Sequence, residues 1–119
     1  MNITPYFNRL EYIEATAQQI IKDFDLFGIE IKFSGNAENA YNELLYTVSP
    51  HISHLLENNY KKLLDLLYRI DVSEGKVSVA LEKNVFGSPA EAIADLVIKR
   101  ELQKIVIRRH YKSEASDSE

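Results

Sequence analysis

Apolar side chains recur every three or four positions over most of this chain, which is the spacing of helices that bury one face. The first run predicts a long amphipathic helix over residues 5–27. Thr4 is placed to cap its start, Pro5 suits the first helical position, and Gly28 suits the end. The apolar face comprises Phe7, Leu10, Ile13, Ala17, Ile20, Ile21 and Phe24.

Residues 29–33 follow a different pattern. Their sequence, Ile-Glu-Ile-Lys-Phe, alternates apolar and charged side chains, which is the period of a half-buried strand. No second stretch of the chain has a matching alternation. The pattern therefore predicts a single short extended segment without an evident partner strand.

Helical spacing returns in the middle of the chain. Asn36 follows a Ser-Gly turn and is placed to cap a helix whose apolar positions continue to Leu56. Pro50 interrupts this run. The pattern allows two helices, with Ser49 as the second cap, or one kinked helix that keeps a continuous apolar face.

Two shorter helices are expected next. The pair of asparagines at 58–59 predicts a break before a helix over residues 60–70. Ser73 is then placed to cap a helix that ends near Lys83. Because the loops between these elements are short, consecutive helices should pack as neighbours in one bundle.

The last helix has the clearest start. Residues 88–91, Ser-Pro-Ala-Glu, place a cap, a first-position proline and an acid at the third position, which is a capping box. The helix should run to about Tyr111, and residues 113–119 have the composition of a disordered acidic tail. The sequence thus predicts an all-α fold. One domain over residues 1–112 forms a compact bundle of five or six helices with long first and last helices, with or without the extended segment at 29–33.

Composition agrees with a single globular domain, since the chain has 119 residues and 45% hydrophobic content. The absence of cysteine excludes disulfides, thiolate metal sites and cysteine nucleophiles. The first residues lack the basic start and apolar run of a secretory signal, and no uncharged apolar stretch of about 18 residues occurs. We therefore expect a cytoplasmic protein without a membrane partner.

Charge is distributed unevenly. Residues 1–98 carry 8 basic and 14 acidic side chains, and residues 99–112 carry 6 basic and 1 acidic. Three further acids lie in residues 113–119, which gives a net charge of −4 for the chain. Of these three segments, only residues 99–112 have a net positive charge.

The stretch 71-DVSEGKVSVALEKN-84 resembles the turn and second helix of a helix-turn-helix DNA reader. The resemblance covers residues 65–84. It departs from the motif at Leu67, where a small residue usually lets the two helices approach, and at Asp71, where the turn usually has glycine.

Charge also disfavours DNA binding by this stretch. DNA affinity depends on neutralising phosphates with Lys and Arg, yet residues 74–83 contain two acids and two lysines. The pattern favours a capped helix at a corner of the bundle. A DNA-binding regulator that uses residues 65–84 remains the alternative function, and nucleic acid is not the expected partner.

Candidate catalytic and metal-binding residues are few. His51, His54 and Glu57 lie three apart on one side of a helix but form an incomplete metal shell. The four glycines are scattered and form no phosphate loop. Acid pairs such as Glu11 with Glu14 and Asp23 with Asp25 are expected on solvated helix faces. We therefore expect no catalytic residues, no metal, no cofactor and no enzymatic activity.

The last helix carries two apolar stripes. Ala94, Ile98, Leu102 and Ile105 form an uninterrupted stripe that should face the core. The second stripe mixes apolar residues with Arg, Lys and Tyr, a composition typical of protein interfaces. Either this helix lies between two layers of its own bundle, with Arg100 and Lys104 reaching outward, or the stripe binds a protein partner or a second copy. The residues of this predicted partner surface are Ile93, Leu96, Arg100, Lys104, Ile107, Arg108 and Tyr111. The expected function is protein–protein interaction or self-association.

Overall fold

The computed structural model describes residues 5–6, 9–83 and 85–117, with side chains described as far as Lys112. Over these residues the chain forms five α-helices and one short 3₁₀ helix, and contains no strand. The prediction of an all-α bundle is confirmed. The elements are α1 (Leu10–Asp25), η2 (Ala37–Asn39), α2 (Ala40–Asn58), α3 (Tyr60–Ile70), α4 (Glu74–Lys83) and α5 (Pro89–Asp117).

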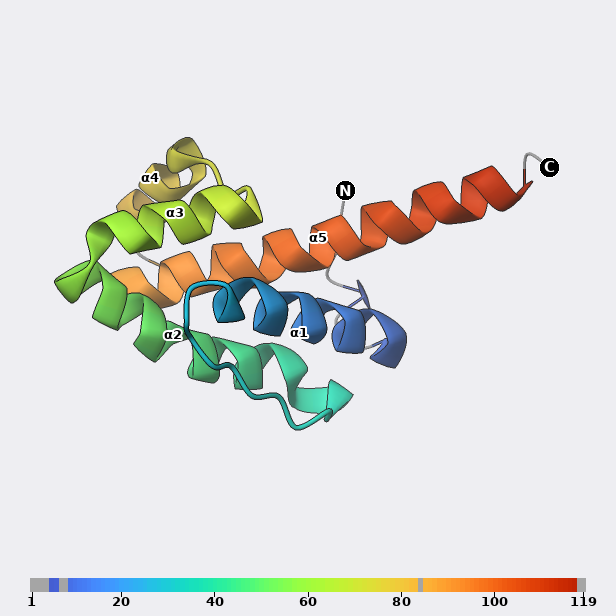
Figure 1. The fold of residues 1–119 in the computed structure, drawn as a ribbon, viewed down its shortest axis with the longest axis horizontal. Coiled ribbons are helices and arrows are strands. Elements are labelled where there is room, and N and C mark those ends of the chain that lie inside the picture. Colours follow the sequence, from blue (N-terminus) through green and yellow to red (C-terminus); the bar gives the residue numbers. More distant parts are fainter. Residues whose placement is uncertain (1–4, 7–8, 84, 118–119) are drawn as a thin grey trace.

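The long helix α5 forms the axis of the molecule. It contacts α1, α2, α3 and α4, and its C-terminal end extends beyond the other helices (Figure 1). The stripe of Ala94, Ile98, Leu102 and Ile105 is buried, as its uninterrupted apolar composition predicts. Ile93 and Val97, on neighbouring sides of the helix, are also buried. The first half of α5 therefore lies between two layers of its own bundle.

Helix α1 buries the face that the sequence predicts, but it is shorter than expected. It begins at Leu10, because Arg9 has an extended backbone and occupies the N-cap position. Thr4, the expected cap, lies outside the described residues. At the other end Gly28 takes a positive φ of 74°, which lets the Ile29 amide donate to the Phe24 carbonyl and closes the helix.

The segment at 29–33 is irregular and extended, and it is not a strand. Ile29 and Ile31 are buried against the core, and the residues between them are exposed. The alternation in the sequence therefore reflects an extended segment that buries one side at the edge of the core and does not pair with a strand among the described residues. The segment is fastened at its end, where the Ser34 amide and hydroxyl both donate to the Glu43 carboxylate of α2, at 2.7 and 2.6 Å.

Pro50 lies inside a single helix, α2, which is 19 residues long. A proline there removes one backbone hydrogen bond. On either side of the gap the apolar face continues, and Val48 and Ile52 are fully buried. The hydroxyl of Ser49 also donates to the Leu45 carbonyl at 2.6 Å. Packing against the core therefore keeps one helix where the pattern also allowed two.

Polar side chains cap the starts of the next three helices. Asn59 accepts a hydrogen bond from the Lys62 amide at the start of α3, and Ser73 accepts one from Lys76 at the start of α4, at 3.1 and 3.2 Å. Ser88 accepts a longer one, 3.4 Å, from the Glu91 amide at the start of α5. These three boundaries lie where the sequence predicts them.

Helix α5 continues to Asp117, past the end expected at Tyr111. It therefore includes residues 113–117, where the sequence predicts disorder. No glycine or proline follows Pro89 to stop the helix, so nothing in the local chemistry opposes its continuation. Residues 118–119 lie outside the described part of the chain.

The cap at Ser73 generates a stability prediction. Replacing Ser73 by Ala should lower the free energy of unfolding by about 0.5–2 kcal/mol, because the Lys76 amide loses its acceptor. Urea denaturation followed by circular dichroism measures the change. Ser78→Ala, an exposed change inside the same helix, should cost nothing. Equal effects of the two substitutions would contradict the capping role.

Candidate functional site

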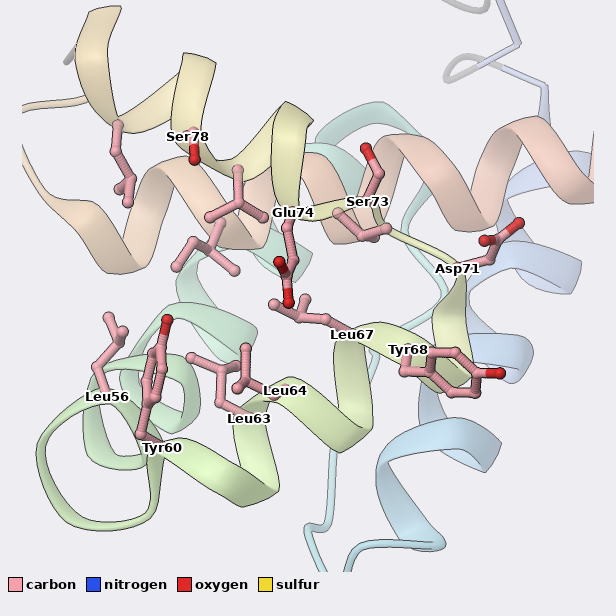
Figure 2. Close-up of a pocket in the computed structure, with 14 residues that line it drawn as sticks. Leu56, Tyr60, Leu63, Leu64, Leu67, Tyr68, Asp71, Ser73, Glu74 and Ser78 are labelled. Carbon is pink, nitrogen blue, oxygen red and sulfur yellow. The ribbon is translucent and has the colours of Figure 1, made fainter.

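An open groove of about 640 Å³ lies between α3 and α4. Leucines and tyrosines of α3 form one wall, Val77 and Leu81 of α4 form the other, and Leu56 of α2 lies at one end. Figure 2 shows Tyr60 and Leu64 directed from α3 toward the α4 side. Ile93 of α5 lies at the floor. Four helices thus combine to leave a mainly apolar surface uncovered.

Several of these side chains meet solvent. Tyr68 is 88% exposed, Tyr60 is 58% exposed, and Leu81 is 40% exposed. Leu56, Leu64 and Val77 are half-buried. Tyr is a residue type enriched in protein interfaces, because its ring supplies apolar area and its hydroxyl tolerates water. The groove therefore presents partly exposed leucine and tyrosine side chains from α2, α3 and α4.

One carboxylate enters this apolar surface. Figure 2 shows the Glu74 side chain directed from the start of α4 into the space above Leu67. No cation is paired with Glu74 among the described side chains, whereas the nearby Asp71 carboxylate is paired with Arg100 at 2.7 Å. The groove therefore contains an unpaired negative charge next to leucines.

The groove exists because α4 is held by α5 and not by α3. None of the residues of α4 is buried, and its packing is mainly on α5. Residues 60–83 do have the order helix, turn, helix that the sequence suggested. However, Leu67 occupies the position where a small residue would let the helices approach, and it lines the groove. The pair is splayed where the motif requires close contact.

Arg100 fixes the turn between α3 and α4. Its Nε donates to the Asp71 carbonyl at 3.1 Å and its Nη2 donates to the Asp71 carboxylate at 2.7 Å. Asp71 has a left-handed backbone, with φ of 71°, which is uncommon for any residue except glycine. Arg100 thereby stabilises the bend that sets the position of α4.

The structure divides the partner surface that the sequence predicts on α5. Ile93 is only 1% exposed and belongs to the core, and Leu96 is half-buried beneath α4. Arg100 fastens the turn, as described above. Lys104 is paired with Glu101 of the same helix at 2.5 Å.

The rest of the predicted surface lies toward the projecting end of α5. Ile107 is half-buried, Arg108 is exposed and Tyr111 is 67% exposed. Periodicity placed six of these residues on one stripe, with Arg108 added beside it, but it could not show that α3 and α4 cover the first half of that stripe. The groove itself was missed, since exposed positions of α3 and α4 meet only in the folded chain.

Removing the Arg100 side chain tests its role. Arg100→Ala should lower the free energy of unfolding by about 1–3 kcal/mol, because it deletes charge-assisted hydrogen bonds to a turn with a left-handed residue. Arg108→Ala, on the exposed side of the same helix, should change it by less than about 0.5 kcal/mol. Thermal and urea unfolding of both variants measure the difference. Equal losses of stability in the two variants would refute the role of Arg100 in holding the turn.

Tyr41 and Asp95 form a second polar contact in the bundle. The Tyr41 hydroxyl of α2 donates to the Asp95 carboxylate of α5, and Lys99 lies 3.1 Å from the same carboxylate. Burial, followed by this hydrogen bond, raises the pKa of Tyr41 above its usual range. The Asp95 side chain is buried despite its charge. Its role is to link α2 to α5.

Two acids also lie buried between α1 and α5. Asp23 and Glu101 are almost fully covered, and three of their oxygens lack a conventional hydrogen-bond partner. Arg69 of α3 is 3.6 Å from Asp23, and Gln19 donates to Asp23 at 3.1 Å. Asp23 was expected on a solvated face, so its burial corrects that expectation.

Burial favours the protonated form of the Glu101 carboxyl. Burial raises its pKa to about 8, and a hydrogen bond to Asp23 acts in the same direction, against the opposing effect of Lys104. A proton held by Glu101 supplies the donor that the facing carboxylate oxygens lack. Because both side chains are buried, we assign this pair to the structure of the core.

This proton predicts how stability depends on pH. The pKa of Glu101 rises from 4.5 when unfolded to about 8 when folded, so between these values the folded state binds more protons. The free energy of unfolding should fall as pH rises through this range, by up to about 1.4 kcal/mol per pH unit from this group.

Glu101→Gln should remove this part of the slope, since an amide does not titrate. Glu14→Gln, an exposed change on α1, should leave the slope as in the unsubstituted protein. Urea denaturation between pH 5 and about pH 8 compares the three proteins. An unchanged slope in Glu101→Gln would show that this carboxyl ionises normally in the fold.

Metal-ligand geometry is not found in the described part of the chain, where no three His, Cys, Asp or Glu side chains gather around a common point. His54 instead contacts the Asn58 side chain at 3.2 Å. None of the helices described combines the length and apolarity needed to cross a bilayer.

Comparisons with protein-family models, with curated proteins and with solved structures give no match.

Proposed function

We propose that this protein works by protein–protein interaction, and that the groove between α3 and α4 is the surface that binds the partner. The observation that carries the proposal is the open apolar groove, with Tyr60, Tyr68 and Leu81 exposed around it. Exposed aromatic and leucine side chains gathered in one hollow are typical of interaction sites, because water leaves them when a partner binds.

The shape of the groove favours a helical or extended segment as the occupant. Apolar side chains occur along α3 from Tyr60 to Tyr68 and along α4 from Val77 to Leu81. Amphipathic helices bind in this way, with apolar side chains at every third or fourth position inserted between two walls. Glu74 then selects a segment that carries a cation beside its apolar positions.

Enzymatic activity receives no comparable support. The buried acids Asp23 and Glu101 lie in the core and not in a cleft. DNA recognition by α4 is the weaker alternative, because the helix has no net positive charge and Glu74 is directed into the groove beside it. Protein binding is the function for which geometry and exposure agree.

A paired substitution tests the groove. Leu81→Glu places a charge on the α4 wall at a position that is already 40% exposed, so the fold should survive while partner binding is lost. Leu26→Glu makes the same change outside the groove, at a leucine that is 61% exposed. Both proteins, with the unsubstituted one, are used to capture partners from cells, and bound proteins are quantified by mass spectrometry.

For Leu81→Glu, the amount of specific partner captured should fall by at least about 90%, which corresponds to a loss of about 1.4 kcal/mol or more of binding free energy. For Leu26→Glu, the captured amount should not change. Thermal unfolding confirms that both variants are folded. If both capture the same partners in the same amounts as the unsubstituted protein, the groove is not the binding surface.

A further inference from the structure

The C-terminal part of α5 extends beyond the bundle, and several of its side chains are exposed (Figure 1). We call residues 107–112 the basic end, because they contain Arg108, Arg109 and Lys112 and no acid. Figure 1 shows that α5 projects past α1 and α2 toward its C-terminus. The basic end lies where α5 passes the end of α1, since the Arg109 guanidinium is 4.8 Å from the Tyr12 ring. The elongation of the molecule, 50 × 30 × 28 Å, reflects this projection.

The exposed side of the basic end is amphipathic. Ile107 and Tyr111 are one helical turn apart, and Tyr111 is 67% exposed. Arg108 lies beside them, exposed and without an acidic partner among the described side chains. Arg109 differs, since its guanidinium lies 4.8 Å from the Tyr12 ring of α1. One unpaired cation therefore adjoins an apolar pair.

The groove offers the complementary arrangement. Among the described side chains Glu74 is an unpaired anion, and the groove is lined by Leu64 of α3 and, two turns further along α4, by Leu81. Resting on the proposed function of the groove, we propose that its occupant is the basic end of a second copy of this chain. Arg108 of one copy pairs with Glu74 of the other, and Ile107 and Tyr111 insert between the two leucines.

A chain cannot fill its own groove in this way. The groove and the basic end lie at opposite ends of the rigid helix α5 (Figure 1). Each copy therefore uses two different surfaces, and each bound pair still has one groove and one basic end free. Such head-to-tail contacts give assemblies that grow with concentration, unlike a closed symmetric dimer.

Charge exchange tests the contact in the full-length protein. Glu74→Arg and Arg108→Glu should each weaken self-association by about tenfold or more, and the double variant should recover most of it, because the pair is restored with reversed signs. Sedimentation velocity over a range of concentrations, at low and high salt, measures the association. The proposed ion pair would be overturned if both single variants are folded and associate more weakly, but the double variant does not recover self-association.

Mixing tests the head-to-tail geometry without relying on one substitution. Leu81→Glu blocks the groove, and Tyr111→Glu blocks the basic end, so each variant alone should be monomeric. An equimolar mixture should form a dimer and no larger species. The intact basic end of the Leu81→Glu copy binds the intact groove of the Tyr111→Glu copy, and the two remaining surfaces are blocked. Leu26→Glu is the matched control and should assemble like the unsubstituted protein. A mixture that stays monomeric, or a closed dimer unaffected by either variant, overturns the proposal.

The two proposals fail in different ways. If the unsubstituted protein is monomeric at all concentrations but Leu81→Glu still loses captured partners, the groove binds another protein and the self-association is refuted. If Leu81→Glu also captures every partner normally, the proposed function fails as well.

Discussion

The central constraint on this fold is that the first half of α5 is apolar on more than one side. Ile93, Ala94, Val97 and Ile98 are all buried, and no single neighbouring helix could cover them. Helices α1 and α2 pack on one part of this surface, and α3 with α4 cover another. The arrangement of the bundle follows from covering one axis, with hydrophobic burial as the main favourable term.

Polar contacts then determine how the helices are oriented and aligned, which hydrophobic burial alone does not determine. Hydrophobic packing has little directional preference, whereas Arg100 holds one specific carbonyl and carboxylate at the turn before α4. The Tyr41–Asp95 contact links α2 to α5, and Asp23 with Glu101 links α1 to α5. These three contacts join α5 to the turn before α4, to α2 and to α1, so they help to fix the register of those elements on the axis.

Much of this architecture could be predicted from local sequence. The caps at Ser73 and Ser88 and the apolar face of α1 depend on neighbours within a few residues, and periodicity reports them well. The strand-like pattern at 29–33 was ambiguous, because alternation shows only that one side of an extended segment is buried. The surroundings of Asp23, Asp95 and Arg100 depend on residues more than 25 positions away, which no local pattern contains.

The groove could not be predicted from local sequence either, because its residues come from helices that meet only in the folded chain. Its two walls differ in how firmly they are anchored. α3 is anchored by four buried side chains, Leu63, Leu66, Leu67 and Ile70, whereas α4 has none. A helix without buried residues separates from its support at a small cost in free energy, well below that of global unfolding. The width of the groove is therefore set by its α4 wall. Under the proposed function, a partner in the groove would contact one wall, α3, that is anchored by buried leucines and another, α4, that has no buried side chain.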